Sequence, residues 1–212
     1  MSGMEAYEAQ SRFRGRLSPQ QDLKLRQSVV AELLRDSARL NLSFQHKYPS
    51  NKYGDLNLDD IVLKGPPWKP ILQNTVPVQR PIFVVIDESL SMQPEARYAS
   101  IQASLLMCKN WRQTGIIGYS TEARLIKPLF EPMEPATLVE HILSSPDPEY
   151  TNLSSALLMA EQISAGCHIL IIGDGCNTMG PDPATLNLHF KSVDLLQLGT
   201  DHRLKSFSAL YS

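Results

Sequence analysis

From residue 81 onward, continuous runs of apolar residues alternate with segments in which apolar residues recur at helical spacing. Residues 82–86 form a continuous apolar run, which is typical of a strand buried on both faces of a sheet. Further strands are predicted at residues 116–119, 124–126, 169–172 and 193–198, and helices at 98–111, 136–143, from 151 onward and at 204–210. This alternation predicts an α/β fold: a doubly wound, mainly parallel, Rossmann-like sheet with helices on both faces.

A separate helix is predicted before this sheet. Ser18 suits its N-cap, Pro19 its first position and Gln21 the reciprocal position of a capping box. Apolar residues then follow at helical spacing as far as residue 40, so one stripe of this helix needs a partner surface.

The length of 212 residues suits one well-buried domain with an appendage. Residues 1–17 are polar and show no periodicity, so we expect a mobile N-terminus. We interpret residues 18–80 as an N-terminal helix with a wrapping extension, in which residues 60–63 could form a short strand. Residues 81–212 are then the main domain.

Composition excludes several classes of function. A formal net charge of −2 gives no general case for binding nucleic acid or an anionic membrane surface. The apolar runs are too short to span a bilayer, and the polar N-terminus has no signal-peptide pattern. The three cysteines have no CxxC spacing, which favours free thiols in a reducing compartment. We therefore expect a cytoplasmic protein.

Polar residues gather where two predicted strands end. Asp87, Ser89 and Ser91 follow the first strand of the main domain, Thr151 lies in a loop that enters a helix, and Asp174 follows a later strand. Ligands of open α/β sheets bind beyond the carboxyl ends of the strands. If the two strands are neighbours, these five side chains converge on one spot.

The predicted cup offers only carboxylate and hydroxyl oxygens. Such hard donors suit Mg²⁺ or Mn²⁺ and disfavour Zn²⁺. In a turn that leaves a strand, alternate residues can face one side, so Asp87, Ser89 and Ser91 would point together. Glu88 and Leu90 would point away, and we expect Glu88 to be solvated or to form part of the rim.

At these positions the sequence resembles the von Willebrand factor A (VWA) domain family and its metal-ion-dependent adhesion site. The family motif is D-x-S-x-S, then a distant Thr and a distant Asp, which fall here on Asp87, Ser89, Ser91, Thr151 and Asp174. The resemblance implies a VWA-like fold in which the serines ligate the metal directly and the aspartates often act through water. It also implies that the threonine joins or leaves the coordination shell of the metal, depending on whether a ligand is bound. An acidic residue of a protein partner then completes the octahedron.

The resemblance covers roughly residues 81–200, and within this range the sequence departs from the family pattern in some places. Leu90 and Tyr150 stand where the family commonly has glycine, and no sixth strand is visible after Leu198. The extension before the main domain is similar, loosely, to that of intracellular VWA proteins of the carbon-monoxide-dehydrogenase accessory type. This likeness implies a MoxR-type AAA+ ATPase as a partner.

Three alternatives remain at this point. The strand ends at Asp87 and Asp174 also resemble those of a Mg²⁺-dependent haloacid-dehalogenase-like phosphatase, but that family requires a second acid where Ser89 stands. A VWA domain could instead act as a scaffold without metal. Thr151 could simply be a helix N-cap, a role compatible with metal binding. The interpretation we favour is a metal-dependent interaction module with no catalytic residues.

Overall fold

The structure is a computed structural model of the chain. It describes residues 7–8, 18–39, 43–45, 55–57, 71–73, 81–89, 92, 94–110, 113–144, 150–198 and 204–206. The strand predicted at residues 60–63 and the site residue Ser91 lie outside these ranges, and so do most of residues 1–17.

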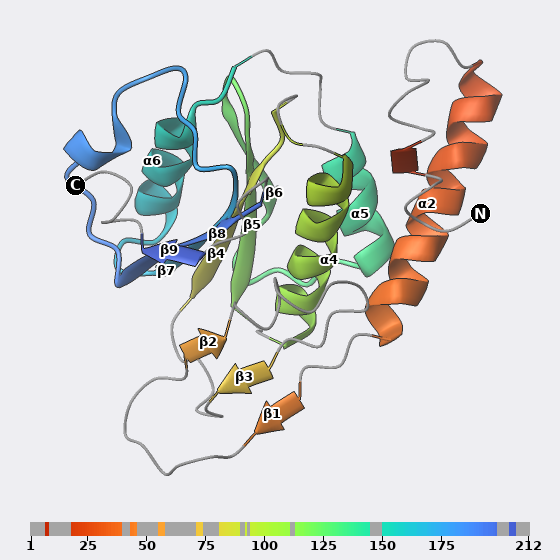
Figure 1. Cartoon of the computed structure of the whole chain (residues 1–212), viewed down its shortest axis with the longest axis horizontal. Helices are drawn as coiled ribbons and strands as arrows, with labels where there is room; N and C mark the ends of the chain where they lie inside the picture. The colour runs from red at the N-terminus through yellow and green to blue at the C-terminus, as the bar shows by residue number, and fades with distance from the viewer. Residues whose placement is uncertain are drawn as a thin grey trace.

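A six-stranded sheet with the strand order β6-β5-β4-β7-β8-β9 forms the centre of the molecule (Figure 1). Its strands are β4 (Ile82–Asp87), β5 (Thr114–Tyr119), β6 (Ala123–Lys127), β7 (His168–Gly173), β8 (Ser192–Gln197) and β9 (Leu204–Ser206). The four inner strands are parallel, and the edge strands β6 and β9 pair antiparallel with β5 and β8. The predicted α/β, doubly wound and mainly parallel fold is confirmed.

Helices cover both faces of this sheet. Helices α4 (Pro94–Asn110) and α5 (Pro135–Leu143) lie on one face, and α6 (Leu153–Ile163) lies on the other with the short 3₁₀ helix η1 (Pro183–Thr185) beside it (Figure 1). Successive side chains of β4 enter opposite cores: Val84 and Ile86 pack with the α4 and α5 side, and Phe83 and Val85 with the α6 side. This alternation is why the central strand is apolar at every position.

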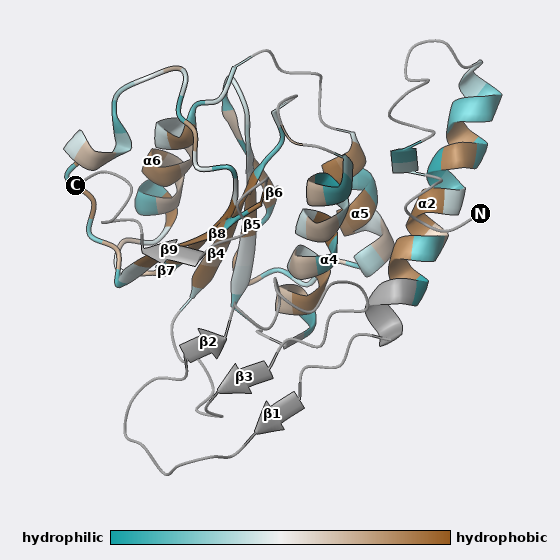
Figure 2. Cartoon of the chain, in the orientation of Figure 1, coloured by the Kyte–Doolittle hydropathy of each residue, from teal (hydrophilic) through white to brown (hydrophobic). Residues whose placement is uncertain are grey.

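The N-terminal helix α2 (Pro19–Arg39) packs outside α4 and α5. The predicted capping box is present, because the Ser18 amide donates to Gln21 Oε1 at 3.0 Å and the Gln21 amide to Ser18 Oγ at 3.4 Å. Val29, Val30, Leu33 and Leu34 of α2 pack into the core on the α4 and α5 side, and polar residues of this helix turn outward (Figure 2). None of the helices in the described ranges has the length and apolar character of a transmembrane span.

A second, three-stranded sheet has the order β1-β3-β2 and is formed by β1 (Ser43–Gln45), β2 (Asp55–Asn57) and β3 (Ile71–Gln73). All three of its strands come from the predicted extension between α2 and β4. Strand β1 pairs parallel with β3, and β2 pairs antiparallel with β3.

Two predictions about the elements were wrong. Residues 204–206 form β9, which pairs antiparallel with β8, so this part of the helix predicted at 204–210 is a strand and the sheet does have a sixth strand. Residues 207–210 lie outside the described ranges. Helix α4 begins at Pro94, four residues before the predicted start at Tyr98. Proline at the first helical position was the sequence signal for this earlier start.

Candidate metal centre

Asp87 is the last residue of β4, and only 2% of its surface is exposed. Its Oδ1 accepts a hydrogen bond of 2.8 Å from the backbone amide of Ser89. Its Oδ2 is buried and has no hydrogen-bond partner within the described part of the chain. Burial is the main cause that raises the pKa of Asp87 from 3.8 to about 6; hydrogen bonds from Ser89 lower it and the charge of Asp174 raises it. A buried carboxylate oxygen without a partner needs a cation or a proton.

Asp174 follows β7, the direct neighbour of β4. The two strands are parallel and in register at Ile86 and Ile172, so their carboxyl ends lie side by side, as the sequence predicted. A Cβ added at Gly173 would lie 2.7 Å from Asp87 Cβ, so glycine here allows β7 to pass close to the Asp87 side chain. Asp174 is partly exposed, and the amide of Cys176 donates to its Oδ1 at 2.8 Å. The two aspartates therefore lie at one edge of the sheet.

Thr151 lies between the loops that follow β5 and β7. The next residue, Asn152, donates its amide to the Ser120 carbonyl at 2.7 Å. The Thr151 carbonyl accepts hydrogen bonds from the amides of Thr178 at 2.9 Å and Met179 at 3.0 Å. Because β5 and β7 flank β4, these bonds place Thr151, which is 4% exposed, beside the carboxyl end of β4.

The N-cap of α6 is Asn152, and the alternative that Thr151 serves as this cap was wrong. The Asn152 side chain accepts a hydrogen bond of 3.1 Å from the Ser155 amide. The amide of Leu153, the first residue of the helix, donates to Asn177 Oδ1 at 2.9 Å. The Thr151 hydroxyl is thus not required for capping.

The structure brings together Asp87, Ser89, Thr151 and Asp174 at one edge of the sheet. Ser89 is 2% exposed and lies beside the Asp87 carboxylate, to which it is hydrogen bonded. The position of the fifth predicted ligand, Ser91, is not described.

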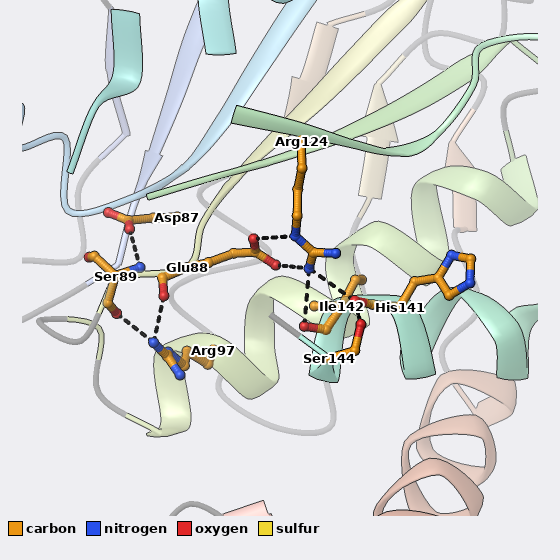
Figure 3. Close-up of polar contacts among 8 residues, drawn as sticks. All are labelled: Asp87, Glu88, Ser89, Arg97, Arg124, His141, Ile142 and Ser144. Atoms are coloured by element: carbon orange, nitrogen blue, oxygen red, sulfur yellow. Dashed lines mark hydrogen bonds and ion pairs between the residues drawn. The ribbon is translucent and has the colours of Figure 1, made fainter. Parts of the chain in front are cut away.

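The environment of Glu88 differs from the predicted one. The Glu88 side chain does point away from Asp87 and Ser89, but it is 5% exposed and does not form part of a solvated rim. Arg124 of β6 binds its carboxylate through two hydrogen bonds, from Nε to Oε2 at 2.9 Å and from Nη2 to Oε1 at 2.5 Å (Figure 3). The alternation of β4 explains the direction, because residue 88 continues the series of Val84 and Ile86 toward α4 and α5.

A second arginine holds the backbone of the same loop. Arg97, in the first turn of α4, donates from Nη2 to the carbonyls of Glu88 at 2.6 Å and Ser89 at 2.7 Å (Figure 3). These contacts were not predicted. The partners are separated by 8 or 9 residues for Arg97 and by 36 residues for Arg124, so no local pattern links them.

The donor set fits a hard divalent cation. Mg²⁺ takes oxygen ligands and commonly retains waters, so two carboxylates and the hydroxyls of Ser89 and Thr151 suit it. The unpartnered Oδ2 of Asp87 is the atom that such an ion would satisfy. Within the described ranges, no three or more His, Cys, Asp or Glu side chains are grouped to hold a metal, so the cup offers two carboxylates and depends on hydroxyl oxygens for its other protein donors.

The sequence matches no protein-family model and no curated protein. Solved structures with a similar fold include the following three. Proximal thread matrix protein 1 from the mussel byssus has a TM-score of 0.46 and 16% identity, over 58% of this chain and 38% of its own. A von Willebrand factor type A structure from Catenulispora acidiphila has a TM-score of 0.45 and 15% identity, over 62% and 35%. Three N-terminal domains of the type V pili tip protein Mfa5 from Porphyromonas gingivalis have a TM-score of 0.36 and 23% identity, over 46% and 20%.

Proposed function

We propose that this protein is a metal-dependent interaction module of the VWA type. Mg²⁺ or Mn²⁺ is held by Asp87, Ser89, Ser91, Thr151 and Asp174, and it binds an Asp or Glu side chain of a protein partner. The protein's part is to present an ion with an open coordination position, and no residue acts as a catalyst.

The observation that carries this proposal is the buried, unpartnered Oδ2 of Asp87 beside a second aspartate. Two carboxylates repel each other and disfavour ionisation unless a cation lies between them. The hydroxyls of Ser89 and Thr151 add neutral oxygen donors, so the bound ion keeps part of its charge to attract an anionic ligand.

A phosphatase is less well supported. Position 89, where a general acid would be required, is a serine that hydrogen bonds to Asp87. Asn177, three residues after Asp174, has a structural role: Oδ1 accepts from the Leu153 amide at 2.9 Å and Nδ2 donates to the Pro181 carbonyl at 3.1 Å. The side-chain oxygen therefore holds the start of α6, and the side-chain nitrogen holds the loop before η1.

Two exposed apolar side chains beside Thr151 suggest what surrounds the partner's carboxylate. Tyr150 is 51% exposed and Met179 is 44% exposed, and both flank the hydrogen bonds that fix Thr151. Aromatic residues and methionine are enriched at protein interfaces. We therefore favour a partner with an acidic residue next to apolar ones. A MoxR-type AAA+ ATPase is the candidate that the resemblance of the extension supports.

Titration of the full chain with Mn²⁺ and Mg²⁺ by calorimetry tests the proposal. We expect one site in the wild type and affinity at least about tenfold lower in Asp87→Ala. Glu140→Ala removes an exposed acid of α5 and is the matched control, which should bind as the wild type does. A wild type that binds neither ion would favour the metal-free scaffold, and hydrolysis of p-nitrophenyl phosphate with Mg²⁺, lost in Asp87→Asn, would favour the phosphatase.

A further inference from the structure

Glu88 occupies a niche that is built for its carboxylate. A Cβ at Gly118 of β5 would lie 2.6 Å from Glu88 Cδ, so only glycine leaves room for the side chain at this point of the sheet. Ile126 of β6 closes the niche, since its Cδ1 lies 2.9 Å from the same added Cβ. Arg124 supplies the charge that balances Glu88. Three residues on two strands thus hold a side chain adjacent to Asp87 in the sequence.

Arg124 also contacts the end of helix α5. Its Nη2 donates to the carbonyl of His141 at 2.9 Å and to that of Ile142 at 3.4 Å, both in the last turn of α5 (Figure 3). A cation is favourable at a helix C-terminus, where carbonyls lack partners within the helix. One guanidinium therefore joins the loop after β4 to the end of α5.

We propose that the Glu88–Arg124 ion pair is the positioning device of the metal cup and ties the loop of Asp87 and Ser89 to the end of α5. The consequence for metal binding rests on the proposed function, whereas the ordering of the loop does not. Arg97 holds the carbonyls of residues 88 and 89, and Arg124 holds the side chain of Glu88, so the loop is fixed from two directions.

Loss of Arg124 leaves a buried carboxylate without a counter-charge, one residue from Asp87. Such a charge is strongly unfavourable, so unless the carboxyl takes up a proton, the loop moves until Glu88 reaches water or the cation of the cup. In the second case Glu88 competes with the partner's carboxylate for the open coordination position. The ion pair therefore keeps an acid of the protein itself away from the metal.

Arg124→Gln, Glu88→Gln and the double variant of the full chain test this inference. We expect Arg124→Gln to speed hydrogen exchange of the Ser89 and Ser144 amides by about tenfold, because these amides lie at the two ends of the network. Its Mn²⁺ affinity should change by about tenfold, falling where the loop is disordered and rising where Glu88 reaches the ion. The double variant has no acid at position 88, so its affinity should lie closer to the wild type than that of Arg124→Gln, while exchange at Ser89 stays fast because the ion pair is still absent.

Glu161→Gln is the matched control, because Glu161 pairs with His189 on the other side of the sheet and its loss should leave both amides and the Mn²⁺ affinity unchanged. Wild-type exchange at Ser89 in Arg124→Gln would overturn the inference. Where Arg124→Gln does not fold, Arg124→Lys and Glu88→Gln decide the question with the same measurements. A wild type that binds no Mn²⁺ would refute the proposed function but not the role of the ion pair in ordering the loop. Hydrogen exchange at Ser89 and Ser144 would still test that role.

Discussion

The burial of Asp87 opposes folding in the absence of metal. Its carboxylate is 2% exposed, and its pKa is raised to about 6 chiefly by that burial. The folded chain therefore binds a proton at Asp87 more tightly than the unfolded chain does. Between pH 3.8 and about 6 the native state holds more protons, so stability falls as the pH rises through this window.

Asp87→Asn should stabilise the metal-free protein above this window. At about pH 7.5 in EDTA we expect a gain on the order of 2 kcal/mol in the free energy of unfolding, since the amide keeps an acceptor for Ser89 and removes the charge. Below about pH 3 the gain should vanish, because Asp87 is then neutral in both states. Urea unfolding at the two pH values measures the difference. Equal stability of the two proteins at the higher pH would contradict the prediction.

Gly173→Ala should weaken metal binding through Asp87. The new Cβ would lie 2.7 Å from Asp87 Cβ and 3.1 Å from Asp87 Oδ2, so the carboxylate has to shift. We expect a loss of stability of about 1–3 kcal/mol, as for overpacking elsewhere, together with lower Mn²⁺ affinity. Gly115→Ala is the matched control, because its Cβ would meet the Phe83 ring, with Cδ1 at 2.6 Å, away from the cup. It should lose stability and keep its affinity, and an equal loss of affinity in both variants would refute the specific effect.

At the scale of single residues, the sequence allowed the convergence of Asp87, Thr151 and Asp174 to be predicted, because their strand ends and loop follow from local patterns. It did not reveal what Glu88 does. A polar residue directly after a strand is usually expected to be exposed. The counter-charge of Glu88 is Arg124, which lies 36 residues away in the sequence, in the β5–β6 hairpin. Such a niche depends on the pairing of β4, β5 and β6 and is not visible in spacing.

Among the elements, helix α2 contributes directly to the core of the main sheet. Leu33 is fully buried in the same cluster as Val84 of β4, whereas Leu23 of the same helix is 56% exposed. Leu33→Ala should therefore destabilise the whole chain by about 3 kcal/mol, and Leu23→Ala by less than about 1 kcal/mol. Chemical unfolding of the two variants compares the same chemical change at a buried and an exposed position. Equal effects would show that α2 does not contribute to the cooperative core.

The inner strands and helices could be predicted because each carries its own periodicity. The run of β4 is apolar since both of its faces are covered, and α5 begins and ends within one residue of its prediction. Strand β9, with the sequence Leu-Lys-Ser, has neither alternation nor β-branched residues, and its pairing with β8 alone determines its structure. The short strands β1 and β3 likewise depend on contacts between distant segments.

At the scale of the whole molecule, the proposed interaction site lies at the carboxyl edge of the central sheet, between its two helical layers. The cup lies at the carboxyl edge of the sheet, the α6 layer supplies Thr151, and the α4 and α5 layer supplies Arg97 and the end of α5. Helix α2 packs on α4 and α5, so it rests on the same helices that hold the loop of Asp87. The cup is therefore supported by both halves of the fold.

A divalent metal should stabilise the molecule in a pH-dependent way. An ion that binds only the folded chain adds about 2.7 kcal/mol at a hundred times its Kd. Protons compete for Asp87, whose pKa in the metal-free protein is about 6, so the gain should be full near pH 7.5 and about half as large near pH 5. Thermal unfolding with Mg²⁺, Mn²⁺ or EDTA at each pH measures the shift in Tm. Asp87→Asn should show little shift at either pH, and a wild-type shift of equal size at both would exclude Asp87 as a ligand.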